Sequence, residues 1–320
     1  MSKEVQELVK RLRPSLSLAE YGRIYTDTTA YMEISYGDVI EIDNQHYLVL
    51  RDEVERSFGI EDPKYWVKRC IHLETGERRI LKLVFHEKFM LKLGTLSIPC
   101  FRSPEKEARI LDLVRGDVRF MQGLSRFDKK GNVVRIIEII GGKRLDHAVF
   151  EIEASHRDYF YEHLPPILEK FIESCRAIKF LHDHGEIHGD IRRDHLWVEY
   201  GTGQYRWIDF DYAYEFEENP FGLDIFGLGS LLIYLVGKQI YTMSNLASQG
   251  FGQEIASTIE QEDFSLLYKN RIVNLRKLFP YIPERLNFIL MHFSNGAEVF
   301  YETVDEFLND LEPCLQEIKR

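Results

Sequence analysis

The sequence predicts an α+β fold of two lobes, in which a small antiparallel β lobe with one main helix precedes a larger helical lobe. Three observations lead to this prediction. Strand-like patterns occupy residues 38–85 and 118–140, and a single helical pattern separates them. After Gly141-Gly142 the patterns become long apolar helical stripes. The chain has 320 residues and 44% hydrophobic content, which is enough to form a packed core.

The amino-terminal extension, residues 1–44, is predicted to hold a helix and the start of the β region. Its helical face carries four apolar residues, Val5, Leu8, Val9 and Leu12. Residues 39–42 and 47–50 are strand-like and flank the polar pair Asp43-Asn44, so we expect a β-hairpin there. We expect the helix to pack against the small lobe; a partner-binding role is the alternative.

The small lobe is assigned to residues 45–140. Its further strands are predicted at residues 65–71, 79–85, 118–127 and 133–140. A helix is predicted to begin after Ser103, because serine is a good N-cap and Pro104 and Glu105 suit the first helical turn. Gly116 is expected to end this helix.

The large lobe is assigned to residues 141–320. A long helix is predicted over residues 166–183, with an apolar stripe along one face and Gly185 as its end. An apolar helix over residues 223–236 contains Asp224 and two glycines. It is shorter than the ~20 apolar residues that a membrane span requires, so we predict a buried core helix.

Composition excludes several classes of function. The formal net charge is −11, which disfavours binding to the phosphate backbone of nucleic acids. The four cysteines are scattered without a C-x-x-C pair and are typical of free thiols in a reducing compartment, at Cys70, Cys100, Cys175 and Cys314. The first ten residues lack the apolar core of a signal peptide. We therefore expect a cytoplasmic protein that binds neither nucleic acid nor membrane.

Two charged residues interrupt apolar patterns. Glu107 shares a helical stripe with Ile110 and Leu111, and Lys82 lies within a strand that is apolar on both faces. A buried charge without a partner is costly, so each side chain needs an opposite charge or an anionic ligand. The simplest solution is that Lys82 and Glu107 pair; the alternative is that each extends to water separately.

A second β-hairpin is predicted around the turn Gly201-Thr202-Gly203, and two aspartates stand just outside it. The first, Asp190, lies in I-H-G-D-I-R-R-D-H, which follows the long helix. The second, Asp209, lies in W-I-D-F-D at the end of the second hairpin strand. Carboxylates in these places can converge, one to orient a hydroxyl and one to hold a divalent cation on phosphates. The alternative is that each only caps a turn.

At these residues the chain resembles the protein kinase superfamily, as a divergent serine/threonine kinase-like member. The stretch L-H-D-H-G-E-I-H-G-D-I-R-R-D-H-L-W-V, followed by W-I-D-F-D, is similar to the catalytic and metal-binding loops of that family. L-E-T-G-E-R-R-I-L-K-L resembles the strand of the phosphate-binding lysine, and E-A-R-I-L resembles the helix of its glutamate partner. I-I-E-I-I-G-G-K-R-L resembles the hinge, and D-I-F-G-L-G-S-L-L-I-Y-L-V-G resembles the buried large-lobe helix. The resemblance covers residues 45–315 and implies the two-lobed protein-kinase-like fold.

The resemblance also implies roles for individual residues. Asp190 would orient the acceptor hydroxyl or act as its base, Asp209 would bind Mg²⁺, and Lys82, fixed by Glu107, would contact the ATP phosphates. The small lobe would then be the nucleotide-binding lobe and the large lobe the catalytic lobe. Further expected positions are Arg192 in catalysis; Glu138, Ile140, Gly59 and Leu196 in nucleotide binding; His195 at the metal; and His188, Phe210 and Asp224 in structural support of the catalytic loop. The implied ligands are ATP, Mg²⁺ or Mn²⁺, and a protein or small-molecule hydroxyl substrate.

The chain departs from the family pattern at several points. Gly59 is the only glycine where a glycine-rich phosphate loop is expected, and His195 replaces the asparagine that would bind a second metal. Imidazole is a poor ligand for Mg²⁺, which prefers oxygen. Gly189 replaces the arginine before the catalytic aspartate, and the segment from Asp209 to Asp224 is short and lacks A-P-E. We therefore expect no phosphate switch in this segment.

Four hypotheses of function remain open at this point. The leading one is an active ATP-dependent phosphotransferase that acts on a protein hydroxyl. The second is a pseudokinase that binds nucleotide or serves as a scaffold, and the third is a small-molecule kinase of the choline or aminoglycoside type. The fourth is a histidine metal cluster, which is disfavoured because His182 and His184 do not share a helical face.

Overall fold

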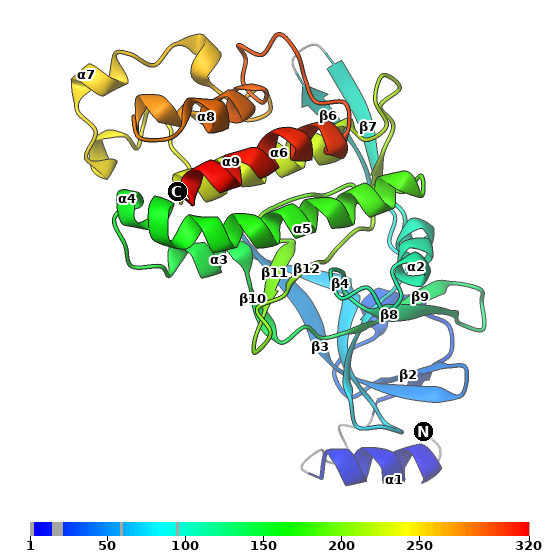
Figure 1. The fold of residues 1–320 in the computed structure, drawn as a ribbon. Coiled ribbons are helices and arrows are strands. Elements are labelled where there is room, and N and C mark those ends of the chain that lie inside the picture. Colours follow the sequence, from blue (N-terminus) through cyan, green and yellow to red (C-terminus); the bar gives the residue numbers. More distant parts are fainter. Residues whose placement is uncertain (1–2, 15–21, 58–59, 94–95, 320) are drawn as a thin grey trace. The chain divides into compact units, whose positions relative to one another are not determined.

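The computed structural model describes residues 3–14, 22–57, 60–93 and 96–319. These residues form two compact units (Figure 1). The first unit comprises Met1–Glu87 and Arg102–Ile140, and the second comprises Lys88–Phe101 and Gly141–Arg320. In the described ranges, no helix is both long and apolar enough to cross a membrane.

The first unit is built on a sheet whose described strands follow the order β1-β2-β3-β4-β5-β9-β8. Figure 1 labels β2, β3, β4, β8 and β9 of this sheet. Only the β1–β2 pair is parallel; the other pairs are antiparallel. The strands are β1 (Ile24–Tyr25), β2 (Val39–Ile42), β3 (Gln45–Ser57), β4 (Ile60–His72), β5 (Arg78–Lys82), β8 (Gly123–Phe127) and β9 (Val133–Glu138). The predicted hairpin is present between β2 and β3, where Asp43 and Asn44 both take positive φ angles (50° and 60°). This is the two-residue turn whose twist matches that of the paired strands.

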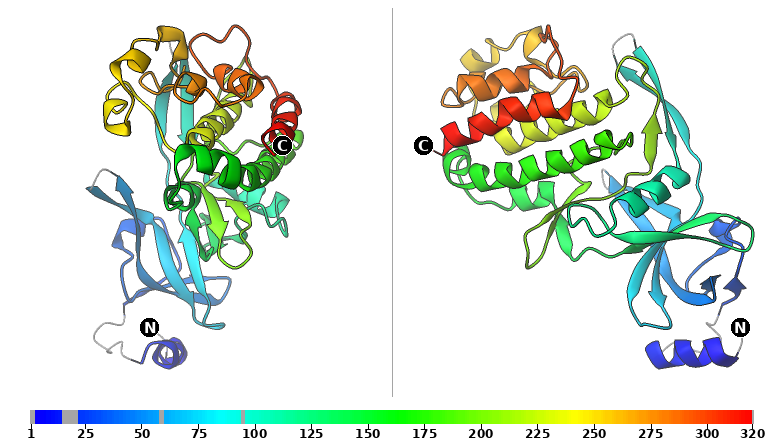
Figure 2. Two further views of the ribbon diagram at one scale, coloured as in Figure 1. Left: turned by 60° about the vertical axis from the view of Figure 1, so that its left-hand side comes forward. Right: turned by 45° about the vertical axis from the view of Figure 1, so that its right-hand side comes forward.

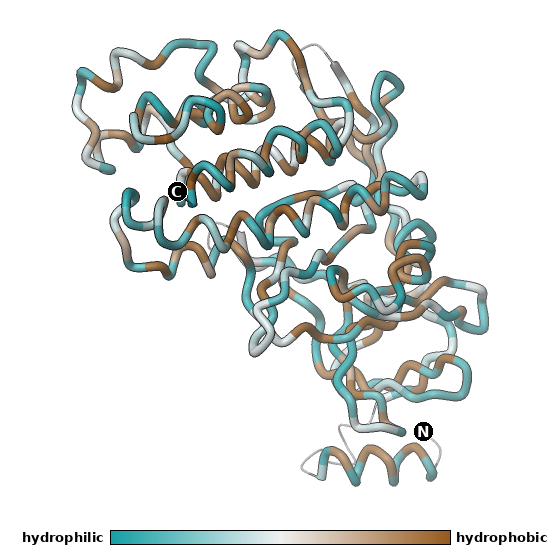
Figure 3. Tube along the Cα trace, viewed as in Figure 1, coloured by the Kyte–Doolittle hydropathy of each residue, from teal (hydrophilic) through white to brown (hydrophobic). Residues whose placement is uncertain are grey.

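The described amino-terminal residues contribute strands to this sheet and a helix that packs on it. Strands β1 and β2 extend the sheet by two strands. Helix α1 (Lys3–Leu12) alternates between hydrophilic and hydrophobic residues along its length (Figure 3). It buries Val5 and Val9 against Val39, Leu48 and Leu73, so the expected packing of the helix against the small lobe is observed.

Helix α2 (Pro104–Leu113) begins as predicted. The Oγ atom of its N-cap Ser103 accepts a hydrogen bond from the backbone N–H of Lys106 at 3.2 Å, and Pro104 occupies the first turn. The strand predicted from residue 118 begins only at Gly123. The side-chain amide of Gln122 donates hydrogen bonds to the carbonyls of Val114, Asp117 and Phe120, which holds this connection as turns.

The second unit is mainly helical. Its long helices are α5 (Leu164–Asp183), α6 (Gly222–Gly237), α8 (Glu284–Met291) and α9 (Val304–Ile318), which pack together side by side (Figure 2). Shorter helices are α3 (Leu145–Phe150), α4 (His156–Asp158) and α7 (Gln253–Ala256). Helix α6 is buried along most of its length, as expected for the apolar segment. All four cysteines are buried and free, as the sequence predicts.

Two small sheets complete the second unit. One contains β10 (Gly142–Arg144), β11 (Leu196–Glu199) and β12 (Tyr205–Trp207). The other has the order β13-β7-β6 and contains β6 (Lys88–Leu93), β7 (Leu96–Arg102) and β13 (Tyr212–Tyr214). The sequence assigned residues 88–101 to the first lobe, but they group with the second unit. The reason is that β7 finds its second partner, β13, more than a hundred residues later in the chain.

These features confirm the predicted α+β class. A largely antiparallel sheet with α2 forms the first unit, and a larger helical unit follows. Helix boundaries in the second unit fall within about two residues of the predicted ones, which is the usual uncertainty of such boundaries.

A partly buried histidine, His156, makes the stability of the second unit depend on pH. The His156 ring stacks on Phe279 with centroids 3.5 Å apart, donates from Nε2 to the Val236 carbonyl at 2.9 Å, and accepts from the Tyr281 hydroxyl at 2.7 Å. Burial lowers the pKa of His156 to about 4. The unfolded chain binds this proton near pH 6.5, so the folded state loses stability as pH falls from about 6.5 to about 4.

We expect the wild-type protein to lose about 2 kcal/mol across this interval from His156, after allowance for its partial exposure. His156→Gln should be less stable at pH 7.5 but should show a shallower loss of melting temperature towards pH 4.5. His184→Gln, at an exposed histidine, serves as the control and should keep the wild-type slope. Parallel slopes for wild type and His156→Gln would contradict the assignment.

Candidate active site

In the first unit, Lys82 and Glu107 form a buried ion pair. Lys82 is the last residue of β5, and Glu107 lies in the first turn of α2. The Lys82 Nζ atom donates to Glu107 Oε1 at 2.7 Å, and the two residues are 5% and 0% exposed. The apolar context of both residues in the sequence thus correctly indicated that they pair.

A third charged residue, Arg135, binds the other carboxylate oxygen of Glu107. The sequence analysis missed it. Arg135 lies on β9 directly opposite Lys82 in the strand register, and it is fully buried. Its Nε donates to Glu107 Oε2 at 3.1 Å, and its two terminal nitrogens donate to the Val133 and Leu83 carbonyls. The signal in the sequence was an arginine inside the apolar strand V-V-R-I-I-E. Because of Arg135, Glu107 stays bound to the sheet independently of Lys82.

The remaining expected nucleotide-binding residues are distributed over both units. Glu138 ends β9, is exposed, and donates its backbone N–H to the Gln122 carbonyl at 2.9 Å. Ile140 is the last residue of the first unit and is partly buried. Leu196 begins β11 in the second unit and is fully buried. Gly59 lies outside the described residues.

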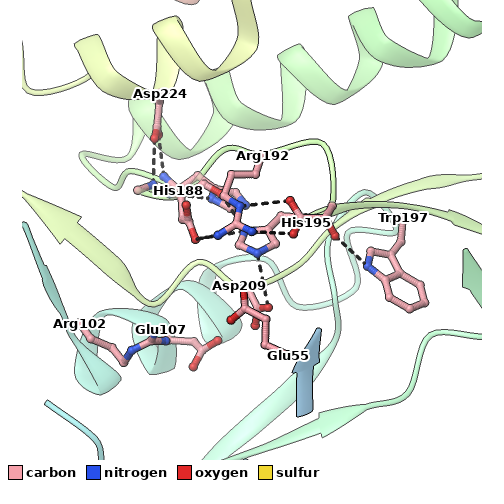
Figure 4. Close-up of polar contacts among 12 residues, drawn as sticks. Glu55, Arg102, Glu107, His188, Arg192, His195, Trp197, Asp209 and Asp224 are labelled. Atoms are coloured by element: carbon pink, nitrogen blue, oxygen red, sulfur yellow. Dashed lines mark hydrogen bonds and ion pairs between the residues drawn. The ribbon is translucent and has the colours of Figure 1, made fainter. Parts of the chain in front are cut away.

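In the second unit, Asp224 fixes the backbone of the loop that carries Asp190. Asp224 lies in the first turn of α6, and its carboxylate accepts the backbone N–H groups of His188 at 2.7 Å and Gly189 at 2.8 Å (Figure 4). His182 Nε2 also contacts this carboxylate at 3.1 Å. Burial acts to raise the pKa of Asp224, but the hydrogen bonds and charges of these partners outweigh it and lower the pKa.

The conformation of this loop explains two of its residues. Gly189 has a φ of +86°, a value that favours glycine and is strained for other residues. His188 is fully buried, and its ring meets Trp207 and Phe210 edge-on, with centroids 5.1 and 6.0 Å away. Its Nδ1 accepts the backbone N–H of Asp190 at 3.3 Å. His188 and Phe210 therefore occupy the interior beneath the loop.

His195 lies between the two aspartates. Its Nδ1 is 2.9 Å from the backbone carbonyl of Asp190 and 3.4 Å from Asp190 Oδ2. Its Nε2 is 3.9 Å from Asp209 Oδ2 (Figure 4). A carbonyl oxygen can only accept, so Nδ1 carries a hydrogen; in the neutral ring Nε2 then presents its lone pair towards Asp209.

Asp190 is flanked by charges of both signs. Burial raises the pKa of its carboxyl above the ordinary value for aspartate, although His195 and Arg192 act in the opposite direction. Arg192 Nη1 lies 3.9 Å from Asp190 Oδ2. The same guanidinium donates two hydrogen bonds to Asp194, from Nε at 3.1 Å and from Nη2 at 2.7 Å. Asp194, which the sequence analysis did not assign, thus sets the orientation of Arg192.

Asp209 has a strained backbone. Its φ of +58° is left-handed, and non-glycine residues in this region are concentrated at functional sites. The preceding N–H of Ile208 donates to the His195 carbonyl at 3.0 Å, which ties the Asp209 segment to the loop of Asp190. Three of the predicted residues, Asp190, His195 and Asp209, are therefore close together in the second unit.

The side-chain atoms available as ligands decide whether the site can hold the expected metal ion. No group of three or more His, Cys, Asp or Glu side chains in the described residues is arranged to hold a metal ion by itself. Asp209 and His195 nevertheless offer an oxygen and a nitrogen donor, and the other ring nitrogen of His195 is bound to a carbonyl, as is usual for metal-ligating histidines. Magnesium commonly takes one or two protein carboxylates and completes its shell with phosphates and water. The residues fit a cation that arrives with a phosphate ligand.

Comparison with known proteins finds similarity among solved structures. No protein-family model and no curated protein sequence matches the chain. Among solved structures, the crystal structure of the Mycobacterium tuberculosis PknI kinase domain, in a mutant form, is similar with 12% sequence identity and a TM-score of 0.47. The match covers 84% of this chain and 95% of that one. At this identity and TM-score the match carries no functional information, so any function must be inferred from the side chains of the chain itself.

Proposed function

We propose that the protein is an ATP-dependent phosphotransferase of the protein-kinase-like class. The observation that carries this proposal is the buried Lys82–Glu107 ion pair, with Nζ and Oε1 2.7 Å apart. A lysine fixed by a carboxylate at the end of a strand is the arrangement that holds the phosphates of ATP in such enzymes. Arg135 secures Glu107 from the other side, so the position of Lys82 is well determined.

The second unit contributes the groups that act on the acceptor. Asp190 accepts the proton of the substrate hydroxyl or orients that hydroxyl, and its raised pKa makes it a stronger base than an ordinary aspartate. Arg192, oriented by Asp194, provides positive charge near Asp190 for the transferred phosphoryl group. The substrate is a protein hydroxyl in the leading form of this proposal and a small-molecule alcohol in the alternative form.

Asp209 and His195 are proposed to hold the divalent cation that accompanies ATP. When bound, such a cation neutralises charge on the phosphate oxygens. His195 also keeps the backbone of Asp190 in place through its Nδ1 hydrogen bond. Glu138 and Ile140 are proposed to hold adenine through their backbone groups, and Leu196 and Gly59 to contribute to the nucleotide site.

A second candidate function is a pseudokinase that binds nucleotide without transferring phosphate. The observation that favours it is the position of His195, where an imidazole rather than an oxygen donor stands beside Asp209. Both functions require nucleotide binding at Lys82, and only the first requires the carboxylate of Asp190 to act on a hydroxyl. They are therefore separable by variants at these two residues.

We expect Mg²⁺–ATP to raise the melting temperature of the wild-type protein and to do so much less in Lys82→Ala. A ligand at 100 times its Kd stabilises the folded state by about 2.7 kcal/mol. Lys82→Ala should fold, because Glu107 retains its contact with the fully buried Arg135. Lys130→Ala, at an exposed lysine of the same unit, should keep the wild-type shift. The absence of any shift in wild type with Mg²⁺ and with Mn²⁺ would remove the basis for a nucleotide site.

A further inference from the structure

The hairpin of β6 and β7 lies in the sequence between Lys82 and Glu107, yet its residues belong to the second unit. Strand β7 is the central strand of its sheet, and its outer partner β13 begins three residues after Asp209. The backbone N–H of Glu215 donates to the Pro99 carbonyl at 3.0 Å, and the Phe89 ring meets Tyr212 edge-on at 5.7 Å. The hairpin thus holds the segment after Asp209 as a strand.

An apolar cluster connects the hairpin to the catalytic loop. Its buried residues are Ile98, Cys100 and Tyr214, which are 2%, 7% and 7% exposed. Partly buried residues that pack against them are Leu91, Ile187, Phe216 and Leu223. Ile187 immediately precedes His188, and Leu223 immediately precedes Asp224. Each of the two residues that form the Asp224–His188 hydrogen bond is therefore adjacent in sequence to a residue of this cluster.

A polar connection runs in parallel with this cluster. The hydroxyl of Tyr214 accepts the backbone N–H of Asp224 at 3.3 Å. The carboxylate of Asp224 in turn accepts the backbone N–H groups of His188 and Gly189. Contacts are thus continuous from β7, through β13 and the first turn of α6, to the residue before Asp190.

We propose that the β6–β7 hairpin is a brace that positions the catalytic loop, through Ile98 of β7 and Tyr214 of the paired strand β13 as positioning residues. This inference rests on the phosphotransfer function proposed above for Asp190. The brace acts on the backbone of residues 187–190 in the second unit, whereas the Lys82–Glu107 pair belongs to the first unit. Loss of the brace should therefore lower kcat and leave KM for ATP nearly unchanged.

The experiment combines native-state hydrogen exchange with kinetics on the full chain. Ile98→Ala should speed exchange of the His188 and Gly189 amides by about tenfold, because the lost side chain loosens the cluster against which Ile187 and Leu223 pack, next to His188 and its acceptor Asp224. It should lower kcat by about tenfold and change KM for ATP less than about twofold. Tyr214→Phe, which removes only the hydroxyl, should produce the same changes to a smaller extent.

Two controls separate positioning from general destabilisation. Ile289→Ala removes an equally buried isoleucine from α8, outside the cluster, and Met90→Ala alters an exposed residue of the same hairpin. Neither should speed exchange in residues 187–190 relative to the rest of the second unit. If Ile289→Ala loosens these amides as much as Ile98→Ala, the brace is overturned.

The remaining outcomes are also decisive. Unchanged exchange of the loop amides in both Ile98→Ala and Tyr214→Phe would overturn the brace, whatever the activity. If the amides loosen as expected but wild type transfers no phosphate, the brace stands and the proposed phosphotransfer fails. If Ile98→Ala does not fold, Tyr214→Phe decides the question by the same readout.

Discussion

Asp190→Asn is expected to lower phosphate transfer by about 10²- to 10⁴-fold, the usual contribution of a positioned general base. The asparagine keeps the size of the side chain but cannot accept the substrate proton. Nucleotide binding should survive, because Lys82 and Glu107 lie in the first unit and are unaffected by the substitution. The measurement is single-turnover transfer from labelled ATP to the protein itself, to a serine/threonine peptide mixture and to a small amino alcohol, alongside the ATP-induced melting shift.

The control for this experiment is Asp183→Asn, which removes an exposed carboxylate at the end of α5. It should transfer phosphate at the wild-type rate. Equal transfer by wild type and Asp190→Asn would indicate a contaminating activity or no chemistry at this site, and the pseudokinase hypothesis would then be preferred. Which acceptor is labelled distinguishes a protein substrate from a small-molecule one.

The pH dependence provides an independent check on Asp190. A base must be ionised, so activity falls as pH drops through its pKa. Because burial raises the pKa of Asp190 in the ligand-free protein, the acidic limb of kcat/KM should lie above the ordinary range of an aspartate. The limb should be absent from the residual activity of Asp190→Asn.

Asp209→Asn is expected to weaken metal-dependent ATP binding and phosphate transfer together, with transfer reduced by about 10²-fold or more. The reason is that Asp209 is the carboxylate of the proposed donor pair and carries a strained backbone that aims it. The measurement is ATP affinity with Mg²⁺, with Mn²⁺ and with EDTA, followed by transfer under the same conditions. An Asp209→Asn variant with wild-type affinity in both metals would contradict the metal role.

His195 provides the matched test of metal choice at the same site. Imidazole nitrogen suits Mn²⁺ better than Mg²⁺, so wild-type transfer should be faster with Mn²⁺. His195→Asn supplies an amide oxygen, which should leave transfer with Mg²⁺ unchanged or higher and reduce the preference for Mn²⁺. If the ratio of the two metals is identical in wild type and His195→Asn, His195 is not a ligand and acts only through its hydrogen bond to Asp190.

Local chemistry explains how much of the fold could be predicted. The turn at Asp43-Asn44, the N-cap at Ser103 and the long helix α5 follow from short-range preferences, and the structure contains all three. The strand predicted from residue 118 was wrong at its start, because the hydrogen bonds of Gln122 hold that connection as turns. Such bonds join residues several positions apart and leave no periodic pattern.

The residues of the candidate site likewise include some that the sequence could predict and some that it could not. Lys82 and Glu107 are recognisable in the sequence because a charge among apolar residues requires a partner. Asp190 and Asp209 are recognisable by their positions around one hairpin, and His195 by the resemblance to the family pattern; the structure brings the three close together. The orientation of Arg192 by Asp194 was not predictable, because its geometry depends on the backbone of the loop.

The sequence by itself determined the α+β class, the buried Lys82–Glu107 pair, and the positions of Asp190 and Asp209 beside one hairpin. Each of these depends on residue type and local spacing. Only the tertiary structure decided that Arg135 shares Glu107 and that residues 88–101 join the second unit. The first depends on the register of β5 against β9, and the second on the pairing of β7 with β13. Register and long-range strand pairing are set by which surfaces pack together across the whole chain, and no local pattern records that choice.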